Sequence, residues 1–196
     1  MDPAYDRLAR FYDHCFAPME STFLGRWREE ALSELPRDAA ILELGSGTGA
    51  NFKYYPPSRL AVSSELSAEM LAVAKTKVRG NLLTQADAQY LPFPENTFDA
   101  VFATLVFCSI PDPMVAFGEV RRVLKHGGTV VLLEHVRPPG WLGNVFDSFN
   151  KLSVALIDDH FNRRTAELAA ASGLEVVEVR SRLKGAVNLI ICRERK

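Results

Sequence analysis

Short apolar segments alternate with segments of helical periodicity through the middle of this chain, and this alternation constrains the fold more than any other feature. The segments with strand character are 39–44, 60–65, 82–86, 98–106 and 129–136. Helices are predicted at 68–79 and 113–124. Segment 98–106 is apolar almost throughout, as expected of a strand that is buried on both faces of a sheet. Strands that alternate with helices predict a parallel sheet of the α/β class.

The two ends of the chain depart from this alternation. Residues 4–35 carry apolar side chains at helical spacing, and Pro18 is predicted to divide them into two helices. Near the other end, the predicted elements are helices at 140–161 and 163–172 and strands at 174–183 and 186–193. The last two strands flank Lys184-Gly185, a spacing that predicts a hairpin. We therefore expect one domain, with N-terminal helices and a seven-stranded, mostly parallel sheet that ends in an antiparallel hairpin.

The composition excludes several classes of protein. With 23 Lys and Arg against 24 Asp and Glu among 196 residues, the chain has a formal net charge of −1 and lacks the basic surplus of nucleic-acid-binding proteins. We therefore expect no nucleic-acid partner. The three cysteines lie far apart and form no CxxC pair, which predicts reduced thiols in a reducing compartment. The four histidines lack metal-ligand spacing, so we expect no metal.

A glycine-rich loop, Gly45-Ser46-Gly47-Thr48-Gly49, follows the first predicted strand directly. Glycine lets the backbone turn tightly and approach a ligand without a Cβ atom in the way. Ligands of open α/β sheets bind at the carboxyl ends of strands, which is where this loop lies. The loop also fits a dinucleotide-binding pattern, Gly45-x-Gly47-x-x-Ala50. From the loop alone, a bound dinucleotide and an ordinary tight turn both remain open.

Two acidic residues stand at the ends of the next two predicted strands. Glu65 ends the second strand, where a carboxylate can accept hydrogen bonds from both hydroxyls of a ribose. Asp87 follows the third strand, where a carboxylate can accept a hydrogen bond from the amino group of an adenine. The alternatives are an exposed acid at a helix entry for Glu65 and a turn-forming aspartate for Asp87. Together with the glycine loop, these acids favour a ligand that contains adenosine.

Four segments of the chain resemble motifs of the class I S-adenosylmethionine (SAM) methyltransferases. They are Ile41–Gly49, Glu65–Leu71, Asp87–Asp99 and Val120–Gly128. Together they cover about residues 39–136, and within the class they resemble the ubiquinone/menaquinone methyltransferase-like group. The segment from Asp87 to Asp99 and the terminal hairpin separate this resemblance from an NAD-binding fold. The resemblance implies a Rossmann-like fold, SAM as the cofactor and S-adenosyl-L-homocysteine as the product.

The resemblance also implies which residues hold the cofactor. The glycine loop would hold the methionine end of SAM, and Glu43 would support that loop or the amino group of the cofactor. Glu65 would bind the ribose, Asp87 the adenine, and Thr104 would line the side of the methyl donor. The full set of implied cofactor-binding residues is Glu43, Gly45, Ser46, Gly47, Gly49, Glu65, Leu66, Asp87, Ala88 and Thr104.

The segments around the predicted acceptor pocket resemble narrower groups. His135–Trp141, Phe146–Asn150 and Asp158–Arg163 resemble parts of the bacterial phosphatidylethanolamine N-methyltransferases and of the lipid-droplet-type thiol methyltransferases. The N-terminal Tyr5-Asp6 and Phe11-Tyr12-Asp13 resemble the segment that closes the active site of the quinone group. The resemblance implies a lipophilic acceptor, with N-methylation of phosphatidylethanolamine towards phosphatidylcholine as the leading hypothesis. The alternatives are a quinone carbon, a small thiol, or a non-catalytic protein that binds SAM or NAD.

A lipid amine as acceptor would need three kinds of side chain. Aromatic rings can surround an amine that becomes quaternary, a carboxylate or imidazole can take the amine proton, and an arginine can hold a phosphate. The candidates are Tyr5, Tyr12, Trp141 and Phe149 for the aromatic surround, Glu134, His135 and Asp159 for the proton, and Arg137 and Arg163 for the phosphate. The Tyr5 hydroxyl is expected to orient the amine. Ordinary packing in the core is the alternative for Trp141 and Phe149.

These assignments divide the single domain 1–196 into a helical cap (1–35), a SAM-binding half (39–136) and an acceptor side with the hairpin (137–196). The apolar stripe of the cap either packs on the sheet or lies on a bilayer. The basic surplus of residues 180–196 either meets an anionic surface or forms the solvated edge of the hairpin. With neither a secretory signal nor a spanning segment in the sequence, we expect a cytoplasmic monomer that contacts the inner face of a membrane reversibly.

Overall fold

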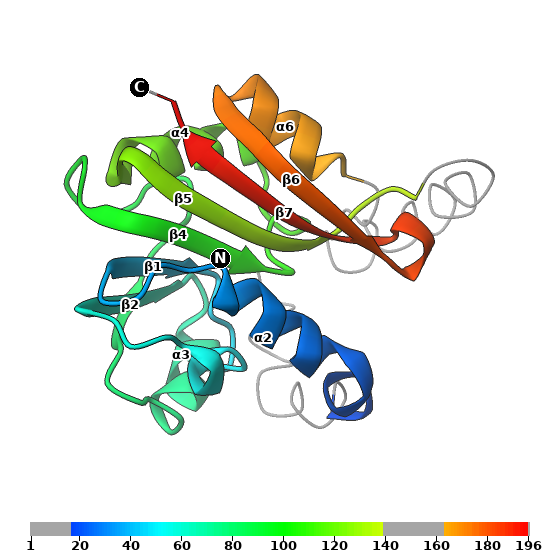
Figure 1. Ribbon diagram of the computed structural model, residues 1–196. Helices are drawn as coiled ribbons and strands as arrows, with labels where there is room; N and C mark the ends of the chain where they lie inside the picture. Colours follow the sequence, from blue (N-terminus) through cyan, green and yellow to red (C-terminus); the bar gives the residue numbers. More distant parts are fainter. Residues whose placement is uncertain (1–16, 139–162, 196) are drawn as a thin grey trace.

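The computed structural model describes residues 17–138 and 163–195, and these form a seven-stranded sheet covered by helices (Figure 1). The strands are β1 (Ala40–Leu44), β2 (Leu60–Glu65), β3 (Leu82–Gln85), β4 (Phe98–Thr104), β5 (Leu124–His135), β6 (Leu174–Arg182) and β7 (Val187–Glu194). Strands β1 to β5 pair in parallel, whereas β7 runs antiparallel to both of its neighbours, β5 and β6. The predicted α/β fold with a terminal antiparallel hairpin is confirmed.

The order of the strands across the sheet, β3-β2-β1-β4-β5-β7-β6, fixes where a ligand can bind. Strand β1 has β2 on one side and β4 on the other, so the loops that follow β1 and β4 diverge at this point. Open α/β sheets bind ligands in the crevice outside the carboxyl ends of the strands at such a reversal. Because Leu44 is in register with Ala103, the loop after Leu44 begins beside Thr104.

Four helices and three short helical turns complete the described fold. They are α2 (Gly25–Ser33), α3 (Ala68–Lys75), α4 (Pro113–Val123) and α6 (Thr165–Ala171), with η1 (Glu20–Leu24), η2 (Phe52–Tyr54) and η3 (Leu183–Gly185). The Ser67 hydroxyl accepts a hydrogen bond from the Met70 N–H at 3.1 Å and caps α3. The Asp112 carboxylate accepts hydrogen bonds from the first turn of α4, which has Pro113 at its first position. These side chains satisfy N–H groups that have no partner within the helix.

The prediction and the structure differ most at three places. Helix α3 ends at Lys75 rather than 79, because the Thr76 N–H turns back to a tighter hydrogen bond with the carbonyl of Val73. Strand β5 begins at Leu124 rather than 129, because Leu124 still pairs with Phe98 across a register shift. Pro18 lies in helical backbone at the start of the described chain, and the helix predicted before it lies outside the described residues.

The central strands β1 and β4 are buried on both faces of the sheet, as expected for its parallel part, whereas the edge strands β3 and β6 are largely exposed. On one face, Leu42 and other residues of the sheet pack against α4, whose Phe117 is fully buried. On the other face, Ile41 packs in a second cluster with Leu32 of α2. Figure 1 shows α2 on the near side of the sheet, with α4 and α6 behind it. Because alternate residues of β1 serve opposite faces, its five residues are all buried.

Two of the three cysteines lie within the described residues; both are buried, and no disulfide joins them. Burial raises the pKa of the Cys192 thiol to about 12. The predicted burial is therefore confirmed for Cys108 and Cys192, while Cys15 lies outside the described residues.

Candidate functional site

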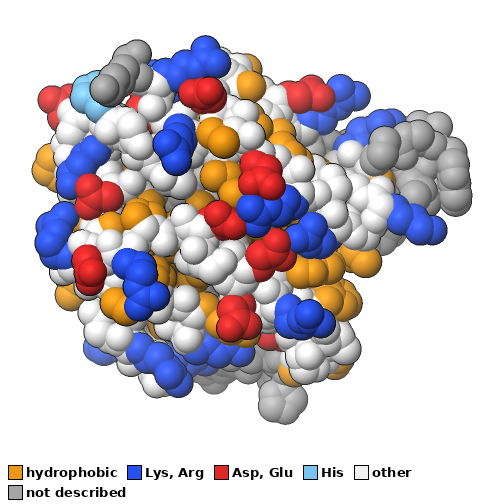
Figure 2. Space-filling view, viewed as in Figure 1, with side chains coloured by type: hydrophobic (Ala, Val, Ile, Leu, Met, Phe, Trp, Pro, Cys, Tyr) orange, Lys and Arg blue, Asp and Glu red, His pale blue; other side chains and the backbone are white. Residues whose placement is uncertain are grey.

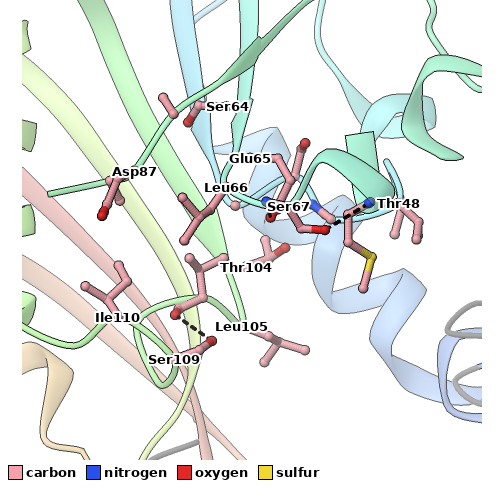
Figure 3. A pocket seen from close by; sticks show the side chains of 18 of the residues that line it. Thr48, Ser64, Glu65, Leu66, Ser67, Asp87, Thr104, Leu105, Ser109 and Ile110 are labelled. Carbon is pink, nitrogen blue, oxygen red and sulfur yellow. Dashed lines mark hydrogen bonds between the residues drawn. The ribbon is translucent and has the colours of Figure 1, made fainter. Parts of the chain in front are cut away.

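A pocket opens at the carboxyl ends of β1, β2, β3 and β4, at the reversal of strand order (Figure 3). The glycine loop forms one part of its wall, and the residues that end β2, β3 and β4 form the rest. Eight of the ten residues predicted to bind the cofactor line it: Gly45, Ser46, Gly47, Glu65, Leu66, Asp87, Ala88 and Thr104. The structure therefore brings together residues that are up to 59 positions apart in the sequence, as the ends of four neighbouring strands.

The glycines of the loop serve different purposes. Gly47 has a φ of +54°, and a Cβ atom built on it would meet no atom within 4 Å. Gly49 has a φ of +82°, and its Cβ would lie 2.5 Å from the ring of Phe52. Gly49 is therefore needed for packing inside the loop and does not line the pocket, whereas Gly47 presents bare backbone to open space. Ser46 lines the same pocket, and its hydroxyl is buried without a hydrogen-bond partner among the described residues.

The two predicted acids lie in the wall and are held by backbone N–H groups. Glu65 accepts hydrogen bonds from the N–H of Gly47 at 2.8 Å and of Ser67 at 2.9 Å, so it ties the end of β2 to the glycine loop. Asp87 accepts a hydrogen bond from the N–H of Gln89 at 2.8 Å. In the view of Figure 3, Leu66 lies between the two acids. The pocket thus presents two fixed carboxylates on the side that the prediction assigned to adenosine.

Glu43 lies behind the loop and does not line the pocket. Its side chain is fully buried and accepts hydrogen bonds from the Asn51 amide at 2.6 Å and from the Tyr55 hydroxyl. Desolvation raises the pKa of Glu43, although its hydrogen bonds act in the opposite direction. Of its two predicted roles, the geometry supports only that of bracing the loop. A direct contact with the amino group of the cofactor stays a prediction.

Sequence analysis missed Arg28, which reaches the pocket from α2. The residue is only 7% exposed, and its Nη1 donates hydrogen bonds to Asn51 at 3.0 Å and to the Thr104 hydroxyl. Its Nε donates to Glu20 at 3.1 Å. Arg28 therefore joins α2 to the loop that follows β1 and to the end of β4. Arg28 stands among other charged residues of the same helix, and the sequence pattern does not indicate which of them turns towards the pocket.

The structure separates the residues predicted for the acceptor. The Glu134 carboxylate is fully buried and accepts hydrogen bonds from the N–H groups of Val106 and Phe107 at 3.1 and 3.2 Å. It braces the turn after β4 and lies outside the pocket wall, which argues against its prediction as a proton acceptor. His135 is half-buried and likewise does not line the pocket.

Arg137 and Arg163 lie side by side, as the backbone N–H of Arg137 donates to the carbonyl of Arg163 at 3.2 Å. Both are half-buried. The remaining predicted acceptor residues lie outside the described part of the chain: Tyr5, Tyr12, Trp141, Phe149 and Asp159.

Comparison with known proteins identifies the family. Residues 42–132 match the family described as "Methyltransferase domain". A phosphatidylethanolamine N-methyltransferase of Cereibacter sphaeroides is 32% identical over 182 residues, which cover 89% of this chain and 87% of that relative. The chain belongs to the class I SAM-dependent methyltransferases. Within them it falls in the quinone methyltransferase-like group, as predicted.

Two further comparisons set the limits of this assignment. A ubiquinone/menaquinone biosynthesis C-methyltransferase, UbiE of Saccharophagus degradans, is 37% identical over 108 residues, and the match spans 50% of this chain but only 43% of that relative. A SAM-dependent methyltransferase of Thermotoga maritima has the same fold, with a TM-score of 0.77 at 21% identity over 97% of this chain and 98% of that one. The family and fold are therefore established, and the acceptor is not.

The pocket fits the family's cofactor, SAM. The unpartnered Ser46 hydroxyl offers a hydrogen bond to a polar ligand, and the bare backbone at Gly47 leaves room for close approach. Glu65 and Asp87 stand where the hydroxyls of a ribose and the amino group of an adenine can donate to them. These residues would hold SAM, and the described part of the chain contains no cluster of three or more His, Cys, Asp or Glu side chains that could hold a metal ion.

Proposed function

We propose that this methyltransferase N-methylates phosphatidylethanolamine. The observation that carries the proposal is the pairing of Arg137 with Arg163 beyond the end of β5. Two arginines from segments that meet through their backbones would provide a site for a phosphate, since arginine binds phosphate through paired, charge-assisted hydrogen bonds. The similarity to a phosphatidylethanolamine N-methyltransferase over most of the chain supports the same acceptor.

Methyl transfer requires the protein mainly to align the acceptor with the methyl group and to remove a proton. When bound, SAM supplies a methyl group on a sulfonium centre, ready for in-line displacement. The chain must then orient the acceptor, exclude water and receive the proton of an ammonium group. With Glu134 held on backbone N–H groups, His135 is the candidate for that proton among the described residues, and Asp159 is the candidate outside them.

A quinone carbon and a small thiol are the competing acceptors. Neither needs a cationic site for a phosphate, so neither gives a reason for two adjacent, half-buried arginines. A quinone C-methyltransferase is nevertheless among the relatives, so the three acceptors must be compared on the same protein.

We also propose a reversible contact with a membrane surface, carried by the N-terminal segment more than by the hairpin. Acidic residues of α2 pair with part of the basic surplus that the sequence places on the hairpin: Arg182 contacts Glu30 at 2.6 Å, and Arg180 contacts Glu34 at 2.6 Å. Figure 2 shows positive and negative side chains interspersed on this face. Of the two alternatives, a solvated edge is thus favoured for β6. Within the described residues, no helix is both long and apolar enough to cross a bilayer.

The test is methyl transfer from labelled SAM to vesicles containing phosphatidylethanolamine, to a demethylated quinone and to a small thiol. Arg137→Gln and Arg163→Gln should each raise the KM for phosphatidylethanolamine roughly tenfold, the cost of one lost hydrogen bond to a charged group, and leave SAM affinity unchanged. Arg164→Gln is the matched control, because Arg164 is exposed and pairs with Glu167. Preferred transfer to the quinone or the thiol would overturn the proposal.

A further inference from the structure

A second cavity adjoins the cofactor pocket where α3 ends. Its walls come from η1 and α2, from η2 and from the turn after α3, and its volume is about 680 Å³. The wall of this cavity shares Arg28, Ala50 and Leu105 with the wall of the cofactor pocket. A molecule bound in the second cavity would therefore lie directly beside the cofactor.

The charges in the wall of this cavity are mainly positive. Glu20 is the one acid among the described residues that line it, and its carboxylate already pairs with Arg28 at 3.1 Å. Three further cations reach the cavity from two separate segments: Lys53 from η2, and Lys77 and Arg79 from the turn after α3. Within the part of the chain that the structure describes, neither Lys53 nor Arg79 forms an ion pair. The cavity therefore carries a positive charge that its own acid does not offset, and this charge favours an anionic ligand.

Apolar side chains accompany these cations. Val78 stands between Lys77 and Arg79 in the turn after α3, lines the same cavity and is 39% exposed. Leu82 begins the edge strand β3 a few positions later and is 58% exposed. An exposed apolar side chain between two cations suits the surface of a lipid bilayer, because the apolar group can enter the acyl boundary while the cations face the phosphates. The same arrangement gives a small inorganic anion nothing beyond the charges.

We propose that this cavity binds the phosphate group of an anionic phospholipid and thereby docks the cofactor pocket against a bilayer. The phosphate accepts hydrogen bonds from Lys53, Lys77 and Arg79, since lysine and arginine both bind phosphate through charge-assisted hydrogen bonds. Val78 and the buried Phe52, which also lines the cavity, contact the apolar part of the lipid. The inference rests on the membrane contact proposed above and gives that contact a site, but it does not depend on which acceptor is methylated.

The first experiment measures binding of the full chain to vesicles, without SAM. Vesicles of phosphatidylcholine are compared with vesicles of phosphatidylcholine and phosphatidylglycerol in equal amounts, and the protein should bind the anionic vesicles more tightly. Lys53→Gln and Arg79→Gln should each weaken this binding roughly fivefold, the contribution of one cation near an anionic surface. Both residues are exposed, so their variants should fold. Lys75→Gln is the matched control and should change binding less than about twofold, because Lys75 is exposed at the end of α3 but does not line the cavity.

A second experiment distinguishes a lipid site from a site for any anion. A short-chain phosphatidylglycerol, titrated below the concentration at which it forms micelles, should bind the wild type more tightly than inorganic phosphate does. Val78→Ser should weaken the binding of this lipid and leave the binding of inorganic phosphate unchanged, because the variant keeps every cation of the cavity. Equal affinities of the wild type for the two ligands would overturn the lipid assignment.

The vesicle results separate this inference from the proposals on which it rests. Equal losses in Lys75→Gln, Lys53→Gln and Arg79→Gln would mean that binding follows net charge, and they would overturn the site while keeping the membrane contact. Failure of the wild type to prefer anionic vesicles would overturn the site and its assigned lipid. Neither measurement uses methyl transfer, so a failure of phosphatidylethanolamine as the acceptor would be detected separately and would not alter these results.

Discussion

On the cofactor side of the pocket, the functional side chains directly follow strands β1 to β4, whereas on the acceptor side they come from separate segments beyond β5. The first group is positioned by the register of the sheet. Once Leu44 pairs with Ala103 and Glu65 with Gln85, the loops after these strands have little freedom in where they begin. The acceptor side has no such common frame, because Arg137 and Arg163 belong to segments that follow β5 and precede α6 and are not neighbouring strands of the sheet.

Three glutamates near strand ends differ in whether they line the pocket. Glu65 lies in the pocket wall, whereas Glu43 and Glu134 are fully buried. All three accept hydrogen bonds that hold a loop, either from backbone N–H groups or from side chains behind it. An acid near a strand end thus braces a loop in each case, and only its exposure decides whether it can also touch a ligand. Sequence position alone does not distinguish these roles.

The largest expected effects come from separating the two glycines of the cofactor loop. Gly49→Val should destabilise the fold by about 2–5 kcal/mol, because a side chain there combines left-handed backbone with a collision against Phe52. Gly47→Val should cost only about 1–2 kcal/mol of stability from its backbone conformation. It should nevertheless lose measurable SAM binding, because its side chain enters the pocket.

Thermal unfolding and calorimetry with SAM measure the two effects on the same samples. Wild-type affinity in Gly47→Val would remove the loop from the cofactor site. Equal losses of stability in both variants would mean that Gly47 is needed for packing as much as Gly49 is.

A smaller effect is expected at the acid that ends β2. Glu65→Ala should weaken SAM binding by about 1–3 kcal/mol, since the ribose hydroxyls lose a charged acceptor and the Gly47 N–H loses its partner. Glu69→Ala is the control, because Glu69 is exposed on the adjoining helix α3 and should bind SAM as the wild type does. Calorimetry with SAM and with NAD tests the assignment. Unchanged SAM affinity in Glu65→Ala, or tight binding of NAD, would break it.

The contrast between the two sides also explains how much could be predicted from the sequence. The seven strands, the hairpin around Lys184-Gly185 and the convergence of eight of the ten proposed cofactor residues on one pocket were all predictable, because strand periodicity and turn residues are local signals. The caps at Ser67 and Asp112 were predictable for the same reason. Because neighbouring strands run parallel, their carboxyl ends lie at the same edge of the sheet, and no further sequence signal is needed to predict that these ends meet.

The residues that sequence reasoning missed depend on contacts between distant elements. Arg28 meets Thr104 across 76 positions, and nothing in the helix around Arg28 indicates which of its charges turns inward. Glu134 was predicted as one of the residues that could take the amine proton, but whether its side chain faces the pocket or the turn after β4 depends on that turn. Burial of polar groups is decided by tertiary packing, which local patterns do not contain.

The smallest expected effect concerns the buried acid behind the glycine loop, and it appears as a dependence on pH. Desolvation raises the pKa of Glu43 above its ordinary value of 4.5, so the folded protein holds this proton more tightly than the unfolded chain does. The stability that the bound proton contributes is fully present below pH 4.5 and is lost as the pH rises through the raised folded-state pKa. The slope cannot exceed about 1.4 kcal/mol per pH unit for one group.

Glu43→Gln removes this titration and keeps a carbonyl oxygen for the Asn51 amide and an amide group that can donate to Tyr55. The melting temperature of Glu43→Gln relative to wild type should therefore increase with pH above 4.5 and then level off. A constant difference in melting temperature from pH 4 to 8 would mean that Glu43 has the same pKa in the folded and unfolded chains. Burial behind the loop would then have no effect on the pKa of this carboxyl group.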